Sequence, residues 1–120
     1  EKVKNIEFIG HVSRNKIATY IAKAIALINT SEREGLPNTV TEAWSYGVPV
    51  IGLNINPDGL IEKFGYFCND NNNKLAISVE DILNNKVKYG NLVKMSREYV
   101  KKYHKIDKTI SLYNKVINEN

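Results

Sequence analysis

Two short apolar runs, each followed by a polar turn, constrain the fold of this chain more than any other feature. One extends from Ala24 to Ile28 and the other from Val48 to Gly52, and neither contains a polar side chain. A strand covered on one face alternates apolar and polar residues, whereas a strand covered on both faces is apolar throughout. The two runs therefore predict strands buried on both faces, as in a parallel sheet between layers of helices.

Further segments extend this pattern of strands and helices. The segment from Ile6 to Gly10 alternates like a short strand and ends at a glycine, and Gly65 to Cys68 predicts a weaker strand. Ser13 is a candidate N-cap for the helix that follows it, and Asn38 is a candidate N-cap for a helix that Gly47 terminates. Strands that alternate with helices indicate an α/β fold, with a Rossmann-like parallel sheet and flanking helices.

The end of the chain predicts helices alone. A polar segment, residues 69–73, has no residue suited to a core and is predicted to be a loop. After it, apolar residues recur at helical spacing. They form three stripes: Leu75, Val79, Ile82 and Leu83; Leu92, Met95, Tyr99 and Tyr103; Ile106, Ile110, Tyr113 and Ile117.

Composition and charge exclude several classes of protein. The single cysteine, Cys68, cannot form an internal disulfide and fits a cytoplasmic location, and no segment approaches the roughly 20 apolar residues of a membrane span. The net charge is +4, and much of the excess lies in the last third. We interpret it as a solvated helix face, although peripheral association with the inner membrane face would suit the same residues. Arginine is scarce and the tyrosines lie in apolar stripes, which argues against nucleic acid as a partner.

The stretch "SEREGLPNTVTEAWSYGVPVIG", residues 31–52, carries the chemistry. The segment from Asn29 to Pro37 leaves the first apolar strand at its carboxyl end, where ligands bind in parallel sheets. It leads into a helix whose first amides, from Asn38 and Thr39, have no partner inside the helix. Those amides and the helix dipole suit a phosphate, and Gly35 would let the backbone approach it. We therefore expect an anion site at this helix.

Two glutamates flank the predicted anion site. Glu42 lies one helical turn beyond Asn38, where its carboxylate can accept hydrogen bonds from vicinal hydroxyls such as those of a ribose. Glu34 lies on the other side, where it can hold hydroxyls of a second group. The arrangement fits a nucleotide sugar. Two other interpretations stay open: glutamates favoured only by the helix dipole, and the acid and nucleophile of a glycosidase.

The segment "EGLPNTVTEAWSYGVPVIG" resembles the signature of the retaining glycosyltransferases of family 4, which have the GT-B fold. "IEFIGHVS" resembles the end of an earlier strand of that family, and "GLIEKFGYFC" resembles a later segment. The resemblance covers about residues 5 to 70. Ten residues of the signature match in register: Glu34, Gly35, Leu36, Pro37, Asn38, Glu42, Ala43, Gly47, Pro49 and Val50.

The resemblance implies a role for each matching position. Glu34 would position the donor sugar without acting as a covalent nucleophile, the backbone from Leu36 to Thr39 would bind the diphosphate, and Glu42 would hold the ribose. The donor would be a UDP- or GDP-linked sugar, transferred with retention of configuration and without a metal or another cofactor. The acceptor would belong to a surface polysaccharide, a lipopolysaccharide or a glycolipid. Three residues would lie against the base: Gly10, His11 and Val12.

The sequence departs from the family in what it does not contain. Members of the family are longer, with an N-terminal domain that binds the acceptor and an early Arg/Lys pair that neutralises the diphosphate. Neither is found in residues 1–120. We therefore expect a single domain that is the later part of a donor-binding domain and is not catalytic by itself. The alternative is a non-catalytic α/β binding module.

Overall fold

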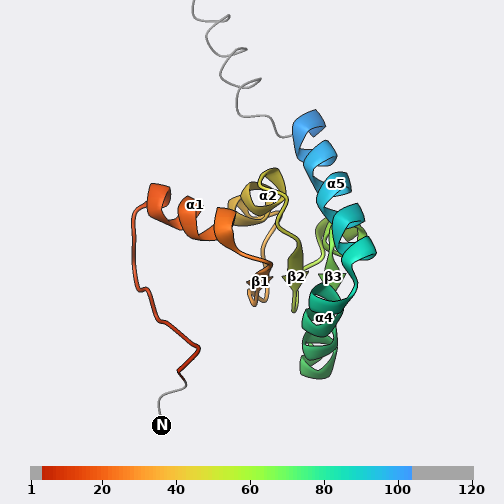
Figure 1. The fold of residues 1–120 in the computed structure, drawn as a ribbon, viewed down its shortest axis with the longest axis horizontal. Coiled ribbons are helices and arrows are strands. Elements are labelled where there is room, and N and C mark those ends of the chain that lie inside the picture. The colour runs from red at the N-terminus through yellow and green to blue at the C-terminus, as the bar shows by residue number, and fades with distance from the viewer. Residues whose placement is uncertain (1–3, 104–120) are drawn as a thin grey trace, which may run out of the picture.

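The computed structural model describes residues 4–103 and confirms the parallel α/β fold. Three parallel strands lie in the order β1-β2-β3, with helices around them (Figure 1). The short 3-10 turn Pro57–Gly59 precedes α3. The other elements follow the chain in this order: α1 (Arg14–Lys23), β1 (Leu27–Asn29), α2 (Asn38–Ser45), β2 (Val50–Gly52), α3 (Leu60–Phe64), β3 (Tyr66–Phe67), α4 (Asn72–Asn84) and α5 (Lys86–Tyr103).

The register of the sheet brings the carboxyl ends of all three strands to one edge. Asn29 at the end of β1 pairs with Gly52 at the end of β2, which in turn pairs with Phe67 of β3. Beyond the strand ends, the Leu53 amide donates to the Asn29 carbonyl oxygen at 2.9 Å. The loop after β1 therefore starts from a backbone position that is held by two neighbouring strands.

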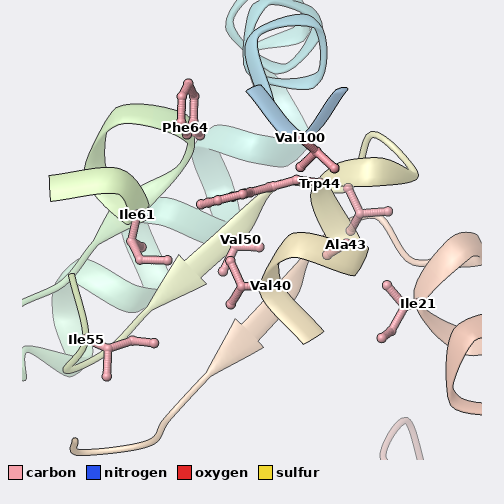
Figure 2. Packing of buried hydrophobic residues seen from close by; sticks show 10 residues of the cluster. Ile21, Val40, Ala43, Trp44, Val50, Ile55, Ile61, Phe64 and Val100 are labelled. Atoms are coloured by element: carbon pink, nitrogen blue, oxygen red, sulfur yellow. The ribbon is translucent and has the colours of Figure 1, made fainter. Parts of the chain in front are cut away.

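The larger core lies on the face of the sheet covered by α1, α2, α3 and the end of α5. Figure 2 shows Trp44 of α2 grouped there with Val50, Phe64 and Val100. The Trp44 and Phe64 rings meet edge to face at 5.3 Å between centroids. Such an arrangement stabilises an aromatic pair beyond the area that it buries. This core fixes α2, the helix that carries Glu42, against the sheet.

The smaller core lies on the opposite face and contains Ile51, Cys68 and Ile82. The central strand β2 is buried at every residue, as its apolar run predicts. The same prediction is wrong for the run from Ala24 to Ile28, which overlaps β1, because Ile25 is 57% exposed and Ile28 is 45% exposed. In the part of the chain that the structure describes, β1 is an edge strand, and the α4 side of the sheet leaves these two side chains partly uncovered.

The strand predicted from Ile6 to Gly10 does not form. These residues have no regular secondary structure, and Phe8 is 95% exposed. Figure 1 shows the segment as an extended trace that reaches α1 without lying against the sheet. The prediction is wrong because an alternating pattern makes a strand only when a second strand supplies the hydrogen bonds, and none lies beside this segment among residues 4–103.

The predicted start of α1 is confirmed, whereas the starts of α2 and α4 differ from the predictions. Ser13 caps α1, since its side chain accepts from the Lys16 amide at 3.4 Å. The predicted loop, residues 69–73, is shorter than expected, because Asn71 caps α4 within it. Asn38 is not the cap of α2 but its first helical residue, and Pro37 occupies the cap position. The stripes of α4 and α5 bury Ile82 and Leu92. The last stripe, residues 106–117, lies outside the described residues.

Candidate functional site

The loop between β1 and α2 is organised from its first residue. The Asn29 side-chain oxygen accepts from the Ser31 amide at 2.9 Å, an arrangement typical of asparagine at a turn. The Ser31 hydroxyl in turn donates to Oε1 of Glu34 at 3.1 Å. Glu34 is exposed. The loop therefore presents the Glu34 carboxylate to solvent with one of its oxygens already held by the protein.

The first turn of α2 offers two amides to a ligand. The Val40 and Thr41 amides donate to the Pro37 carbonyl oxygen, at 3.1 and 3.4 Å. Within the described residues, the amides of Asn38 and Thr39 have no acceptor. Unpaired amides at a helix N-terminus, together with the positive end of the helix dipole, favour an anion. These two amides are therefore free to donate to a ligand, and the binding of a phosphate to them stays a prediction.

Gly35, Leu36 and Pro37 connect Glu34 to these amides. The partly buried Leu36 packs against the larger core, so the middle of the loop is anchored to the protein. A Cβ built on Gly35 would meet no atom within 4 Å. The protein itself therefore leaves space beside Gly35, next to the backbone that carries the two amides. Pro37 has the extended conformation, with φ −65° and ψ 147°.

Glu42 lies one turn along α2 and is partly buried. Its neighbours Ala43 and Trp44 are fully buried, so the backbone that carries Glu42 is held by the core. No donor reaches the Glu42 carboxylate from residues 4–103. The carboxylate is therefore available to accept hydrogen bonds from a ligand next to the α2 N-terminus.

The three residues expected at the base are in a different part of the structure. Gly10 and His11 are exposed, Val12 is partly exposed, and all three precede α1. Figure 1 shows this segment apart from the sheet and from the loop after β1. Residues 34–42 are consecutive and lie together at the start of α2. Gly10, His11 and Val12 do not lie beside them. Their contact with the base stays a prediction.

Ser31 is absent from the site residues that the sequence singles out. Two spacings could have indicated it. Asparagine commonly accepts a hydrogen bond from the amide two residues on, as Asn29 does here, and a serine three residues before a glutamate can reach its carboxylate within a tight loop.

An open pocket elsewhere does not share the features of this site. It has a volume of about 290 Å³ and lies on the α4 side of the sheet, lined by Ile25, Ile82, Leu83, Lys86 and Tyr89. Its lining is mainly apolar, and the Tyr89 hydroxyl is already used, since it donates to the Ile25 carbonyl oxygen at 2.9 Å. It lacks the convergent polar groups that fix a ligand in a specific site.

Residues 4–103 contain no group of three or more His, Cys, Asp and Glu side chains placed to hold a metal ion. None of the helices among these residues has the length and apolar content needed to cross a membrane.

The comparisons with known proteins agree with the geometry. Residues 1–85 match the model of the family described as "Glycosyl transferases group 1". The match includes the loop after β1, the whole of α2 and both glutamates. No curated protein and no solved structure matches the chain significantly.

Proposed function

This chain belongs to the group 1 glycosyl transferases, and on that premise we propose that it binds the nucleotide-diphosphate sugar of a retaining glycosyltransferase. The observation that carries the proposal is the pair of unpaired amides of Asn38 and Thr39, at the start of a helix that leaves the carboxyl edge of a parallel sheet. In such sheets this edge is where nucleotides bind.

The diphosphate binds at the start of α2. Its oxygens accept from the Asn38 and Thr39 amides, and the helix dipole stabilises their negative charge. Arg33, exposed in the same loop, is the cation nearest in sequence to these amides. Because few positive charges contribute, we expect binding that is weak and that decreases as the salt concentration rises.

The two glutamates bind the hydroxyl groups on either side of the diphosphate. A carboxylate repels a phosphate but accepts hydrogen bonds from vicinal hydroxyls, and each charged hydrogen bond of this kind contributes about 1.5–3 kcal/mol. Glu42, one turn into α2, holds the ribose, and Glu34, before the turn, holds the donor sugar. The donor therefore lies across the start of α2 with its diphosphate in the middle.

In the proposed reaction, the sugar leaves its diphosphate and joins an acceptor hydroxyl on the same face, so that the anomeric configuration is retained. Glu34 positions the sugar and forms no covalent bond with it. The acceptor in this proposal is a surface polysaccharide, a lipopolysaccharide or a glycolipid under construction. The enzyme would meet such acceptors at the inner face of the membrane.

Isothermal titration calorimetry of the chain with UDP, GDP and ADP tests the proposal. We expect one nucleotide to bind in preference to the others, and Glu42→Ala to weaken that binding about tenfold or more. Glu80→Ala, at an exposed position of α4, is the matched control and should bind like the wild type. If none of the three binds at millimolar concentration, the proposed donor site is wrong.

A further inference from the structure

We propose that Ser31 is a positioning residue that holds the Glu34 carboxylate ready for the donor sugar. The inference rests on the proposed function, since it assigns a role to the hydrogen bond from Ser31 to Glu34 only if Glu34 binds the sugar. It goes beyond that function because Ser31 itself touches no part of the donor. It acts through the glutamate.

A continuous set of hydrogen bonds connects Glu34 to the sheet. The Asn29 carbonyl oxygen accepts from the Leu53 amide at 2.9 Å, so the end of β1 is tied to the loop after β2. The Asn29 side chain accepts from the Ser31 amide, also at 2.9 Å. The Ser31 hydroxyl donates to Oε1 of Glu34 at 3.1 Å. Oε1 is therefore connected through three successive hydrogen bonds to the backbone at the edge of the sheet.

Such a connection matters because Glu34 is exposed. A free glutamate side chain samples many rotamers and must lose that freedom when it binds a ligand, which weakens the binding. A hydrogen bond that already selects one rotamer removes part of this cost. The carboxylate has about four acceptor positions, so the hydroxyl of Ser31 occupies one and leaves the others to the sugar.

A general effect of Ser31 on the loop would have a different consequence. The same loop carries Leu36 and leads to the amides of Asn38 and Thr39, which contact the diphosphate in the proposed function. If Ser31 merely shaped the loop, its removal would weaken the binding of the nucleotide and of the nucleotide sugar equally. If it positions Glu34, its removal weakens only the part of the binding that the sugar contributes.

The test measures Kd for UDP, GDP, UDP-glucose and GDP-mannose, using the complete chain. For the nucleotide and nucleotide sugar that the wild type binds, we expect Ser31→Ala to raise the Kd for the nucleotide sugar about three- to tenfold. The Kd for the free nucleotide should stay unchanged. Ser31→Thr keeps the hydroxyl and should restore the wild-type affinity. In a double-mutant cycle, Ser31→Ala should have no further effect in a Glu34→Ala background.

The outcomes separate this inference from the function on which it rests. A wild-type chain that binds neither the nucleotide nor the nucleotide sugar would overturn both. A wild-type chain that binds both with equal affinity would leave the nucleotide site standing and overturn the role of Ser31, because Glu34 would then not hold the sugar. A wild-type preference for the nucleotide sugar that Ser31→Ala leaves intact would overturn only the role of Ser31. An equal loss of affinity for the nucleotide and the nucleotide sugar in Ser31→Ala would also overturn that role. So would losses of affinity that add in the Ser31→Ala, Glu34→Ala double mutant.

Discussion

Gly47, just after the end of α2, lies directly against Val93 of α5. A Cβ built on Gly47 would be 2.8 Å from Cγ1 of Val93 and 3.2 Å from Cδ of Arg97. Gly47 also has φ +75°, a left-handed conformation that other residues rarely adopt. Two separate constraints therefore exclude a side chain at Gly47: its left-handed backbone and the close approach of α5.

We predict that Gly47→Ala lowers the free energy of unfolding by about 1–3 kcal/mol, because it combines a strained backbone with a contact that the helices must open to relieve. The measurement is chemical denaturation followed by circular dichroism. Gly90→Ala is the matched control. Gly90 lies in the second turn of α5 and has no atom within 4 Å of a built Cβ, so Gly90→Ala should raise the free energy of unfolding by about 0.5–1 kcal/mol. A tolerated Gly47→Ala would show that α2 and α5 pack less closely.

A second prediction concerns Tyr66 of β3 and Asp81 of α4. The Tyr66 hydroxyl donates to Oδ2 of Asp81, and Nζ of Lys88 in α5 lies 3.2 Å from that oxygen. The hydrogen bond from Tyr66, and then the one from Lys88, lowers the pKa of Asp81 below its usual value. Burial, and then the hydrogen bond to Asp81, raises the pKa of Tyr66.

Because the pKa of Asp81 is lower in the folded state, its contribution to stability is present above the unfolded pKa and disappears as the pH falls through the folded one. We therefore predict that Tyr66→Phe lowers the urea midpoint at pH 7 more than at pH 3. The exposed Tyr46 supplies the control substitution Tyr46→Phe, which should have little effect at either pH. Equal losses at both pH values would mean that Tyr66 stabilises the protein without acting on the Asp81 charge.

A third prediction concerns a substitution that removes one amide from the proposed donor site and keeps the helix. Asn38→Pro deletes the amide at the first position of α2, where proline is well tolerated. The preceding Pro37 already has the extended conformation that a residue before proline requires. We expect the free energy of unfolding to change by less than about 1 kcal/mol, because that amide has no partner in the helix.

The affinity of this variant for the preferred nucleoside diphosphate should fall about three- to tenfold, since one hydrogen bond to the diphosphate is lost. Calorimetric titration provides the measurement. Asn38→Ala, which keeps the amide and removes only the side chain, should bind like the wild type. Unchanged affinity in Asn38→Pro would show that this amide does not contact the ligand.

A fourth prediction concerns the assignment of Glu42 to the ribose. The wild type should bind the 2′-deoxy form of its preferred nucleoside diphosphate about tenfold more weakly than the ribose form, because the deoxy sugar leaves Glu42 one donor short. Glu42→Ala should bind the two forms equally. The comparison needs only the two Kd values for each protein. A variant that still prefers the ribose form would place the ribose away from Glu42.

The fold could be predicted where the pattern of a segment agrees with its surroundings. β2 is buried on both faces because helices cover both faces of the central strand. Ile28 has the same apolar character but lies in an edge strand, and it is 45% exposed. The alternating residues from Ile6 to Gly10 have no adjacent strand at all within residues 4–103. A local pattern specifies which residues can form a strand, but pairing depends on segments that lie elsewhere.

The same distinction applies to the site. The amides of Asn38 and Thr39 and the position of Glu42 could be predicted, because helix geometry places them relative to one another within a single turn. The hydrogen bond from Ser31 to Glu34 depends on the conformations of two side chains in an irregular loop. The contact of Gly47 with Val93 depends on how two helices far apart in the sequence pack together. Neither follows from spacing alone.

In the proposed function, the start of α2 binds the diphosphate of a nucleotide-sugar donor. Amide NMR spectroscopy during a titration with UDP or GDP can test this binding, because it reports each backbone amide separately. The largest changes in chemical shift should occur at Asn38 and Thr39, with smaller ones extending to Glu42. Changes centred instead on the pocket beside Ile25 and Tyr89, or no saturable change at millimolar nucleotide, would contradict the claim.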